Sequence, residues 1–161
     1  MTGEALRVIG RIKSPDAFNT LSQLQKSMPE AGAAILSVVG VNGLAAELPR
    51  LLRVVDDASP GQGAYWDALW SFGELAAKAG VTDLSPLERA RDGDDPVVRG
   101  VAWLGLAKAG RVTDPSDLKR ALQAATNFVE RVIIGVAGAM IGYPAALEEG
   151  LHAAIDRKSV V

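Results

Sequence analysis

The sequence contains an internal repeat, and this repeat constrains the fold more than any other feature. Residues 78–83 (KAGVTD) recur as residues 108–114 (KAGRVTD) with one residue inserted. Each copy is followed by a proline and then by an apolar segment with charged flanks. Weaker copies of this pattern begin at Gly40 and Gly142, so the glycines at positions 40, 80, 110 and 142 are 40, 30 and 32 residues apart. Because this interval is typical of helical hairpin repeats, we expect a stack of helical hairpins.

Helix start and stop signals accompany the repeat. Asp95 and Asp114 each precede a proline, and Ser85 precedes Pro86 with an acid at the third helical position, a pattern typical of helix N-termini. Gly80, Gly110 and Gly142 follow apolar segments, where a left-handed glycine would end a helix. No segment alternates with the period of a strand, so no strand is predicted. The expected helices span residues 3–13, 15–27, 29–39, 44–56, 63–79, 85–91, 96–109, 115–126, 128–141 and 144–157.

The expected helices after residue 29 alternate between two types. Four carry a single apolar stripe and charged residues elsewhere: residues 44–56, 85–91, 115–126 and 144–157. The other four are apolar over most of their circumference and must therefore lie between neighbours: residues 29–39, 63–79, 96–109 and 128–141. We expect one helical repeat domain over residues 1–161. Its parts are N-terminal capping helices with a degenerate first repeat (1–43), three repeats (44–80, 81–110 and 111–142) and a C-terminal capping helix (143–161).

Residues 95–110 (DPVVRGVAWLGLAKAG) resemble the second helix of a HEAT repeat, which has an Asp-Pro start, a Val-Arg pair and a glycine-terminated apolar end. Residues 127–132 are similar with Asn in place of Asp, and residues 65–69 keep the frame without the Arg. The resemblance covers residues 44–157. It implies an all-α, right-handed α-solenoid of about four HEAT-like hairpins. It also implies an Asp/Arg ladder between repeats through Asp95, Arg99 and Arg131, which is interrupted at Leu69.

Aligning the apolar helices on Trp66, Pro96 and Phe128 predicts how they pack. Four residues on, the aligned positions are Trp70, Gly100 and Val132, and seven residues on they are Gly73, Trp103 and Gly135. Each Trp thus faces a glycine in an adjacent copy, and repeats of this kind contact their neighbours. We therefore predict that Trp70 and Trp103 pack between repeats, the alternative being that they bind a ligand.

A second stripe on the same helices points away from the first and changes from polar to apolar toward the C-terminus. Its residues are Asp67, Ser71, Glu74 and Lys78, then Val97, Val101, Leu104 and Lys108, then Val129, Ile133, Val136 and Met140. In a HEAT-like stack this layer lines the concave groove, where partners bind. The apolar end predicts either a partner segment or a cover formed by the last helix or a dimer mate.

Composition argues against most catalytic chemistry. The 161 residues include no Cys and one His, and 17 basic residues against 19 acidic ones give a formal charge of −2. His152 and Glu148 share a helix face without a second His, and Asp92, Asp94 and Asp95 lack the spacing of a calcium loop. The glycine-rich residues 59–63 lack the Lys of a phosphate-binding loop. No catalytic residue, metal site or cofactor is predicted.

Several basic residues gather in the second half of the chain: Arg89, Arg91, Arg99, Arg111, Lys119, Arg120 and Arg131. Acids are as numerous there, which does not favour nucleic acid as a partner. The N-terminus has no secretory signal, and the uncharged stretches 31–46 and 132–147 are shorter than the roughly 20 residues of a membrane span. We expect a cytoplasmic, non-catalytic module that binds a protein or peptide, such as an adaptor, assembly factor or inhibitor. The alternative is a HEAT-like enzyme or accessory subunit, as in bilin lyases and DNA glycosylases.

Overall fold

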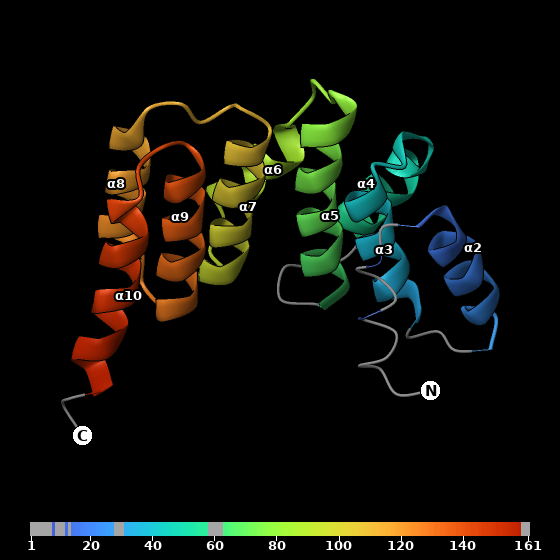
Figure 1. Ribbon diagram of the computed structural model, residues 1–161, viewed down its shortest axis with the longest axis horizontal. Coiled ribbons are helices and arrows are strands. Elements are labelled where there is room, and N and C mark those ends of the chain that lie inside the picture. The colour runs from blue at the N-terminus through green and yellow to red at the C-terminus, as the bar shows by residue number, and fades with distance from the viewer. Residues whose placement is uncertain (1–7, 9–11, 13, 28–30, 58–62, 159–161) are drawn as a thin grey trace. The chain divides into compact units, whose positions relative to one another are not determined.

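The computed structural model describes residues 8, 12, 14–27, 31–57 and 63–158, and within this part helices joined by short loops and turns are the only regular secondary structure (Figure 1). The elements are α2 (Pro15–Leu24), α3 (Ala31–Asn42), the 3₁₀ helix η1 (Ala45–Glu47), α4 (Leu48–Asp57), α5 (Gly63–Ala79), α6 (Ser85–Arg91), α7 (Pro96–Lys108), α8 (Pro115–Ala124), α9 (Phe128–Met140) and α10 (Ala145–Lys158). The all-α prediction is confirmed, although the helix expected at 3–13 lies almost wholly outside the described residues. The helix expected at 44–56 begins as η1 and continues as α4.

The helices belong to two compact units, Met1–Asp83 and Leu84–Val161. The border lies close to the boundary expected between repeats 44–80 and 81–110. In the first unit α3 packs along α5, while α2 packs on α3 and α4 packs on α5. In the second unit α6 packs on α7 and α8 on α9, α7 and α9 lie side by side, and α10 packs along α9.

The apolar helices supply most of the buried core. The largest fully buried side chains of the first unit include Leu21, Ile35, Val38, Leu51, Leu69, Phe72 and Leu75, and those of the second unit include Leu87, Leu106, Leu118 and Ile134. Burying such side chains drives folding by about 1.5–3 kcal/mol each. Within the described part of the chain, no helix has both the length and the apolarity needed to cross a membrane.

Left-handed glycines end four of the helices or follow them directly. Gly43, Gly80, Gly110 and Gly142 have φ between 65° and 88°, which confirms the prediction for the last three. In three copies the N–H after the glycine donates to the carbonyl five residues earlier: Leu44 to Val39 at 3.0 Å, Arg111 to Leu106 at 2.9 Å and Tyr143 to Gly138 at 2.9 Å. This is the Schellman arrangement. The repeat pattern placed the end of the helix before Gly40, which was wrong. Helix α3 continues to Asn42, and the left-handed glycine that follows it is Gly43.

Gly110→Ala is expected to lower the free energy of unfolding by about 1 kcal/mol, because an L side chain is strained at φ +70°. A Cβ there would meet nothing within 4 Å, so the loss would come from the backbone alone. Gly110→Asn should lose less, since Asn tolerates this conformation. Urea unfolding of the two variants checks this order, and equal losses would contradict it.

Helix N-termini are capped largely as the sequence predicts. Asp95 accepts hydrogen bonds from the N–H groups of Val97 and Val98 at 2.8 and 3.1 Å, and Asp114 accepts one from Ser116 at 2.8 Å. The prediction for Ser85 was wrong by one position, because α6 begins at Ser85 and its cap position is Leu84. Leu84 is buried and its side chain makes no cap hydrogen bond.

Candidate functional site

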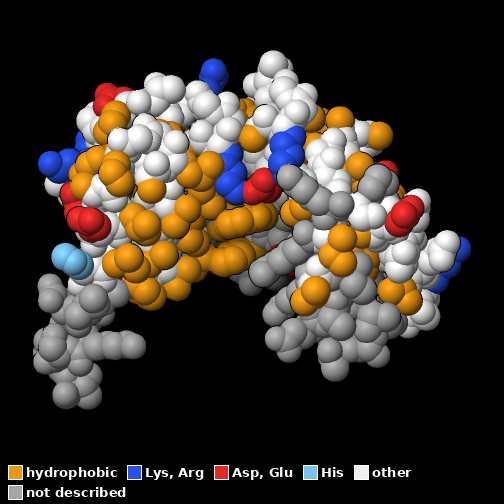
Figure 2. Space-filling view, in the orientation of Figure 1, with side chains coloured by type: hydrophobic (Ala, Val, Ile, Leu, Met, Phe, Trp, Pro, Cys, Tyr) orange, Lys and Arg blue, Asp and Glu red, His pale blue; other side chains and the backbone are white. Residues whose placement is uncertain are grey.

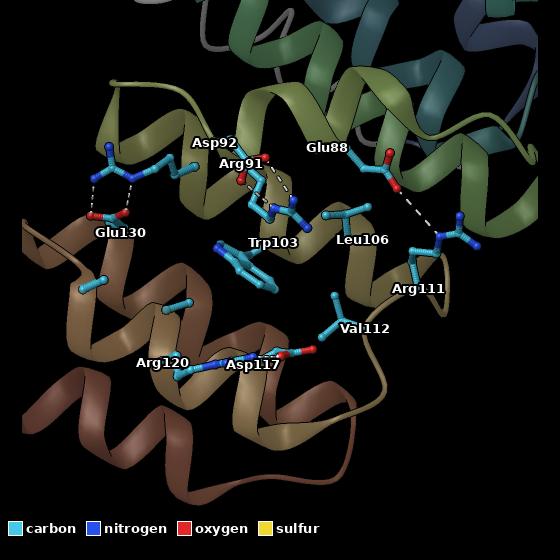
Figure 3. A pocket seen from close by; sticks show the side chains of 13 residues that line it. Glu88, Arg91, Asp92, Trp103, Leu106, Arg111, Val112, Asp117, Arg120 and Glu130 are labelled. Atoms are coloured by element: carbon cyan, nitrogen blue, oxygen red, sulfur yellow. Dashed lines mark hydrogen bonds and ion pairs between the residues drawn. The ribbon is translucent and has the colours of Figure 1, made fainter.

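A pocket of about 600 Å³ opens in the second unit, with residues of α6, α7 and α8 around it. We call it the Trp103 pocket, because the half-buried indole of Trp103 lies at its centre (Figure 3). The Arg91 guanidinium lies 5.6 Å from the centroid of this ring, a cation–π distance. Leu106, Val112 and Ala121 supply apolar lining.

Four arginines and four carboxylates line the Trp103 pocket, and they pair with one another. The pairs are Arg91 with Asp92 at 2.8 Å, Arg99 with Glu130 at 2.7 Å, Arg111 with Glu88 at 3.8 Å, and Arg120 with Asp117 at 2.5 Å. The hydrogen bond from Arg91 lowers the pKa of Asp92 below its ordinary value, which keeps this exposed carboxyl ionised. The pocket therefore has no net formal charge.

The Arg99–Glu130 pair joins α7 to α9. Arg99 donates Nε to Glu130 Oε1 at 2.7 Å and an Nη to Oε2 at 3.1 Å, a two-point contact. Glu130 is only 2% exposed, and its Oε2 also accepts from the Thr126 N–H at 2.8 Å. Nothing in the spacing of the predicted ladder pointed to Glu130. The available signal was its position three residues after the cap Asn127, whose side chain accepts from the Glu130 N–H at 2.8 Å.

The other two predicted ladder residues, Asp95 and Arg131, make their hydrogen bonds to backbone groups close to them in the sequence. Asp95 caps α7. Arg131 donates to the Ala125 carbonyl at 3.2 and 3.1 Å. Of the three, Arg99 alone forms a side-chain hydrogen bond to the neighbouring helix pair within the described residues, and its partner there is the carboxylate of Glu130. The physical reason is that the short side chain of an Asp directly before a helix reaches the unpaired N–H groups of the first helical turn and accepts hydrogen bonds from them.

Within the second unit, the predicted pairing of Trp103 with Gly135 was wrong. A Cβ on Gly135 would lie 2.8 Å from the Ala146 carbonyl oxygen of α10, and one on Gly100 would lie 3.2 Å from the Ile133 Cβ of α9. At both glycines the missing side chain leaves room for the neighbouring helix, and a tryptophan does not fill that space. Gly73 is buried. Trp103 lies on its pocket, and Trp70 is 39% exposed.

The polar part of the predicted groove forms a second pocket, of about 470 Å³, within the first unit. We call it the Trp70 pocket. The structure brings the predicted Asp67, Glu74 and Lys78 together there, with Trp66, Trp70, Ser37 and Val41 completing the lining. Ser71 was misplaced, because it is fully buried on α5 against Gly40 of α3.

The apolar part of the predicted groove is divided between the core and the surface. Val101 and Leu104 are buried in the second unit and cannot line an open groove, while Val97 and Lys108 are half-buried. Three stripe residues of α9 are exposed: Val129 at 43%, Val136 at 37% and Met140 at 53%. We call these three the α9 stripe. Figure 2 shows hydrophobic side chains gathered over the part of the second unit where Figure 1 draws α9.

The last helix leaves the α9 stripe uncovered. α10 approaches α9 at Gly135 and Gly138, where Ala146 lies against both. With 3.6 residues per turn, positions 135 and 138 lie on the opposite side of α9 from positions 129, 136 and 140. The alternative in which the C-terminal helix of this chain covers the stripe is therefore wrong for the described residues.

The residues considered for metal or phosphate chemistry lie apart. His152 is exposed on α10, and the residues that the structure describes include no group of three or more His, Asp or Glu suited to a metal ion. Asp92 pairs with Arg91, and the Asp94 carbonyl accepts from Arg99 at 2.8 Å. Of the glycine-rich segment 59–63, residues 59–62 lie outside the described part, and α5 begins at Gly63.

Comparisons with protein-family models, with curated proteins and with solved structures found no match to this chain. Function is therefore inferred from the two pockets and the α9 stripe.

Proposed function

We propose that this chain is a non-catalytic protein-binding module built from HEAT-like helical hairpins, and that it docks a partner protein through the α9 stripe. The exposed stripe is the observation that carries the proposal. Large apolar side chains on an otherwise buried helix mark a surface that gains free energy when a partner covers it. Met140 suits such a surface, because its unbranched side chain adapts to different partners.

The packing order supports the HEAT-like part of the proposal. α6 with α7 and α8 with α9 form successive helix pairs, and α7 lies beside α9 as the second helices of neighbouring repeats do. The helix ends recur at Gly80, Gly110 and Gly142. The proposed architecture is a right-handed stack of about four hairpins. A rigid stack of this kind presents its binding surface ready-made, so that little ordering is needed when a partner docks.

The Trp103 pocket is the feature that favours the alternative, a HEAT-like enzyme or accessory subunit, because aromatic and carboxylate groups converge there. Each carboxylate in the pocket is engaged by an arginine, at 2.5 to 3.8 Å. A general acid or base needs a carboxyl group positioned to exchange a proton with substrate. The paired arrangement is better suited to holding a polar surface of a partner than to proton transfer.

The variant Val136→Asp/Met140→Asp is expected to lose partner binding at least tenfold, because two carboxylates would be buried in an apolar contact. Affinity capture from the native source with quantitative mass spectrometry measures the loss. Leu151→Asp is the matched control, since it places the same charge on a 43% exposed apolar residue of α10. Circular dichroism confirms that the three chains fold alike.

Two results would contradict the proposal. If the double variant retains the same proteins as the wild type, the α9 stripe is not the docking surface. If light scattering shows a wild-type dimer that the double variant converts to a monomer, the stripe joins two copies of this chain and the partner is not a different protein.

A further inference from the structure

The Trp103 pocket fills a gap between α6 and α8, the first helices of the two helix pairs in the second unit. α6 packs on α7 and α8 packs on α9, but α6 and α8 do not pack along each other. Trp103 of α7 points into this gap, with Arg91 of α6 on one side and Arg120 of α8 on the other (Figure 3). The volume of about 600 Å³ is typical of pockets that hold a ligand. The gap therefore has room for a large side chain from another molecule.

The exposed ion pairs of this pocket use the edges of the guanidinium groups. A guanidinium is planar, and its N–H donors lie in that plane, so a carboxylate bound at the edge leaves the faces open. Arg91 shows both uses at once: its Nε and Nη2 donate to Asp92 at 2.8 and 3.0 Å, while the group lies over the Trp103 ring. Arg120 donates Nη2 to Asp117, and its side chain is 76% exposed. A ring can therefore stack on Arg120 without breaking an ion pair.

The charge and the apolar part of the lining favour a neutral aromatic group. Arginines and carboxylates are equal in number around the pocket, so a purely anionic or cationic ligand would meet as many like charges as opposite ones. Trp103 and Ala121 are half-buried and Ala124 is exposed, which gives an entering side chain apolar surface to cover. An aromatic ring gains more here than an aliphatic side chain, because its negative face attracts a guanidinium and it also packs well on an indole.

The loosest ion pair of the rim suits the main chain that would carry such a ring. Arg111 Nε lies 3.8 Å from Glu88 Oε1, which is beyond hydrogen-bond distance. The two side chains are 65% and 42% exposed, and an exposed pair of this kind contributes little stability. A peptide chain supplies C=O acceptors for Arg111 and N–H donors for Glu88. A peptide segment therefore satisfies both members of the pair, which a ring alone does not.

We propose that the Trp103 pocket binds an aromatic side chain of a peptide segment. The ring packs between Trp103 and Arg120. The main chain beside it bonds to Arg111 and Glu88. This site goes beyond the docking proposed for α9 and does not rest on it, because no residue of the α9 stripe lines the pocket. It gives the second unit another recognition site, for a neutral segment with an aromatic residue.

Nuclear magnetic resonance of the full chain tests the site directly. The three tryptophans give three indole N–H signals, assigned through Trp→Phe variants. The probe is a blocked peptide with one central phenylalanine among glycines and serines. The Trp103 signal should shift on titration, while those of Trp66 and Trp70 in the first unit stay in place. A version with cyclohexylalanine, which has nearly the same size but no aromatic ring, should bind at least about threefold more weakly.

Two variants separate the roles of the guanidinium face and the rim. Arg120→Gln should weaken the phenylalanine peptide about threefold and leave the cyclohexylalanine peptide nearly unchanged, because only the aromatic ring gains from the guanidinium. Glu88→Ala should weaken both peptides alike, by about fivefold, because it removes an acceptor of the main chain. Arg53→Gln is the matched control on an exposed arginine of the first unit and should bind as the wild type does. The Val136→Asp/Met140→Asp chain should also bind the peptide normally.

Four outcomes would overturn the proposal. Absence of a Trp103 shift with the phenylalanine peptide would mean that the pocket takes no such segment. Shifts at Trp66 or Trp70 instead would place the peptide in the first unit. Equal affinity for the phenylalanine and cyclohexylalanine peptides would exclude stacking on arginine. Equal affinity for benzyl alcohol would make the ligand a small aromatic molecule. Peptide binding without docking through the α9 stripe, or the reverse, distinguishes failure here from failure of the proposed function.

Discussion

Gly40→Ala is expected to destabilise the first unit by about 2–3 kcal/mol, because the new methyl group would enter occupied backbone space. A Cβ at Gly40 would lie 2.7 Å from both the Cα and the carbonyl oxygen of Ser71. Neither atom can move without shifting α5, and the α3–α5 contact carries much of the buried core of this unit. The clash outweighs the gain of roughly 1 kcal/mol that alanine brings to a helix interior.

Urea unfolding followed by tryptophan fluorescence measures this loss. Trp66 and Trp70 lie in the first unit, so a Trp103→Phe background confines the signal to it. Gly32→Ala is the control in the same helix. Its Cβ would meet the flexible end of Gln25 at 3.3 Å, and stability should change little. Equal stability of the Gly40→Ala and Gly32→Ala chains would mean that α3 and α5 do not approach this closely.

Glu130→Ala is expected to cost the second unit about 3 kcal/mol, because it leaves the Arg99 guanidinium without its carboxylate in a largely buried position. The side chain of Glu130 is 3% exposed and that of Arg99 is 21% exposed. The substitution also removes the acceptor of the Thr126 N–H, which lies just before α9. Both losses loosen the contact between α7 and α9.

The exposed pair in the same pocket provides the comparison for this prediction. The side chains of Arg120 and Asp117 are 76% and 41% exposed, so Asp117→Ala should cost less than about 1 kcal/mol. Arg99→Met combined with Glu130→Ala should recover part of the loss, since no unpaired charge is left behind. The measurement is urea unfolding followed by Trp103 in a background of Trp66→Phe and Trp70→Phe. A Glu130→Ala loss no larger than that of Asp117→Ala would show that the buried pair does not hold the two helices together.

Local features of this chain could be predicted because their causes lie within a few residues. Asp95 caps α7 because Pro96 starts a helix and the N–H groups of Val97 and Val98 need an acceptor. Gly110 ends α7 because it adopts a positive φ at little cost. The exposed residues Val136 and Met140 were found from spacing alone, as positions of one helix face.

Contacts between helices were predicted less well. Equal spacing along three helices suggested that Trp103 meets Gly135, but Gly135 is filled by the backbone of α10 near Ala146. Val101 and Leu104 share the spacing of the exposed stripe and are nevertheless buried. A face calculated from one helix says which residues lie together, and the neighbouring helices decide whether that face is covered.

By itself, the sequence determined the helices, most of their caps and the glycines that end three of them, since these depend on residues one to five positions apart. The tertiary structure alone decided that Glu130 receives Arg99, that Trp103 and Trp70 each lie on a pocket, and that α10 covers the other side of α9 from the stripe. The physical reason is that burial and pairing are properties of side chains brought together from different helices. Arg99 and Glu130 are 31 residues apart in the chain, and only the packing of α7 on α9 makes them neighbours.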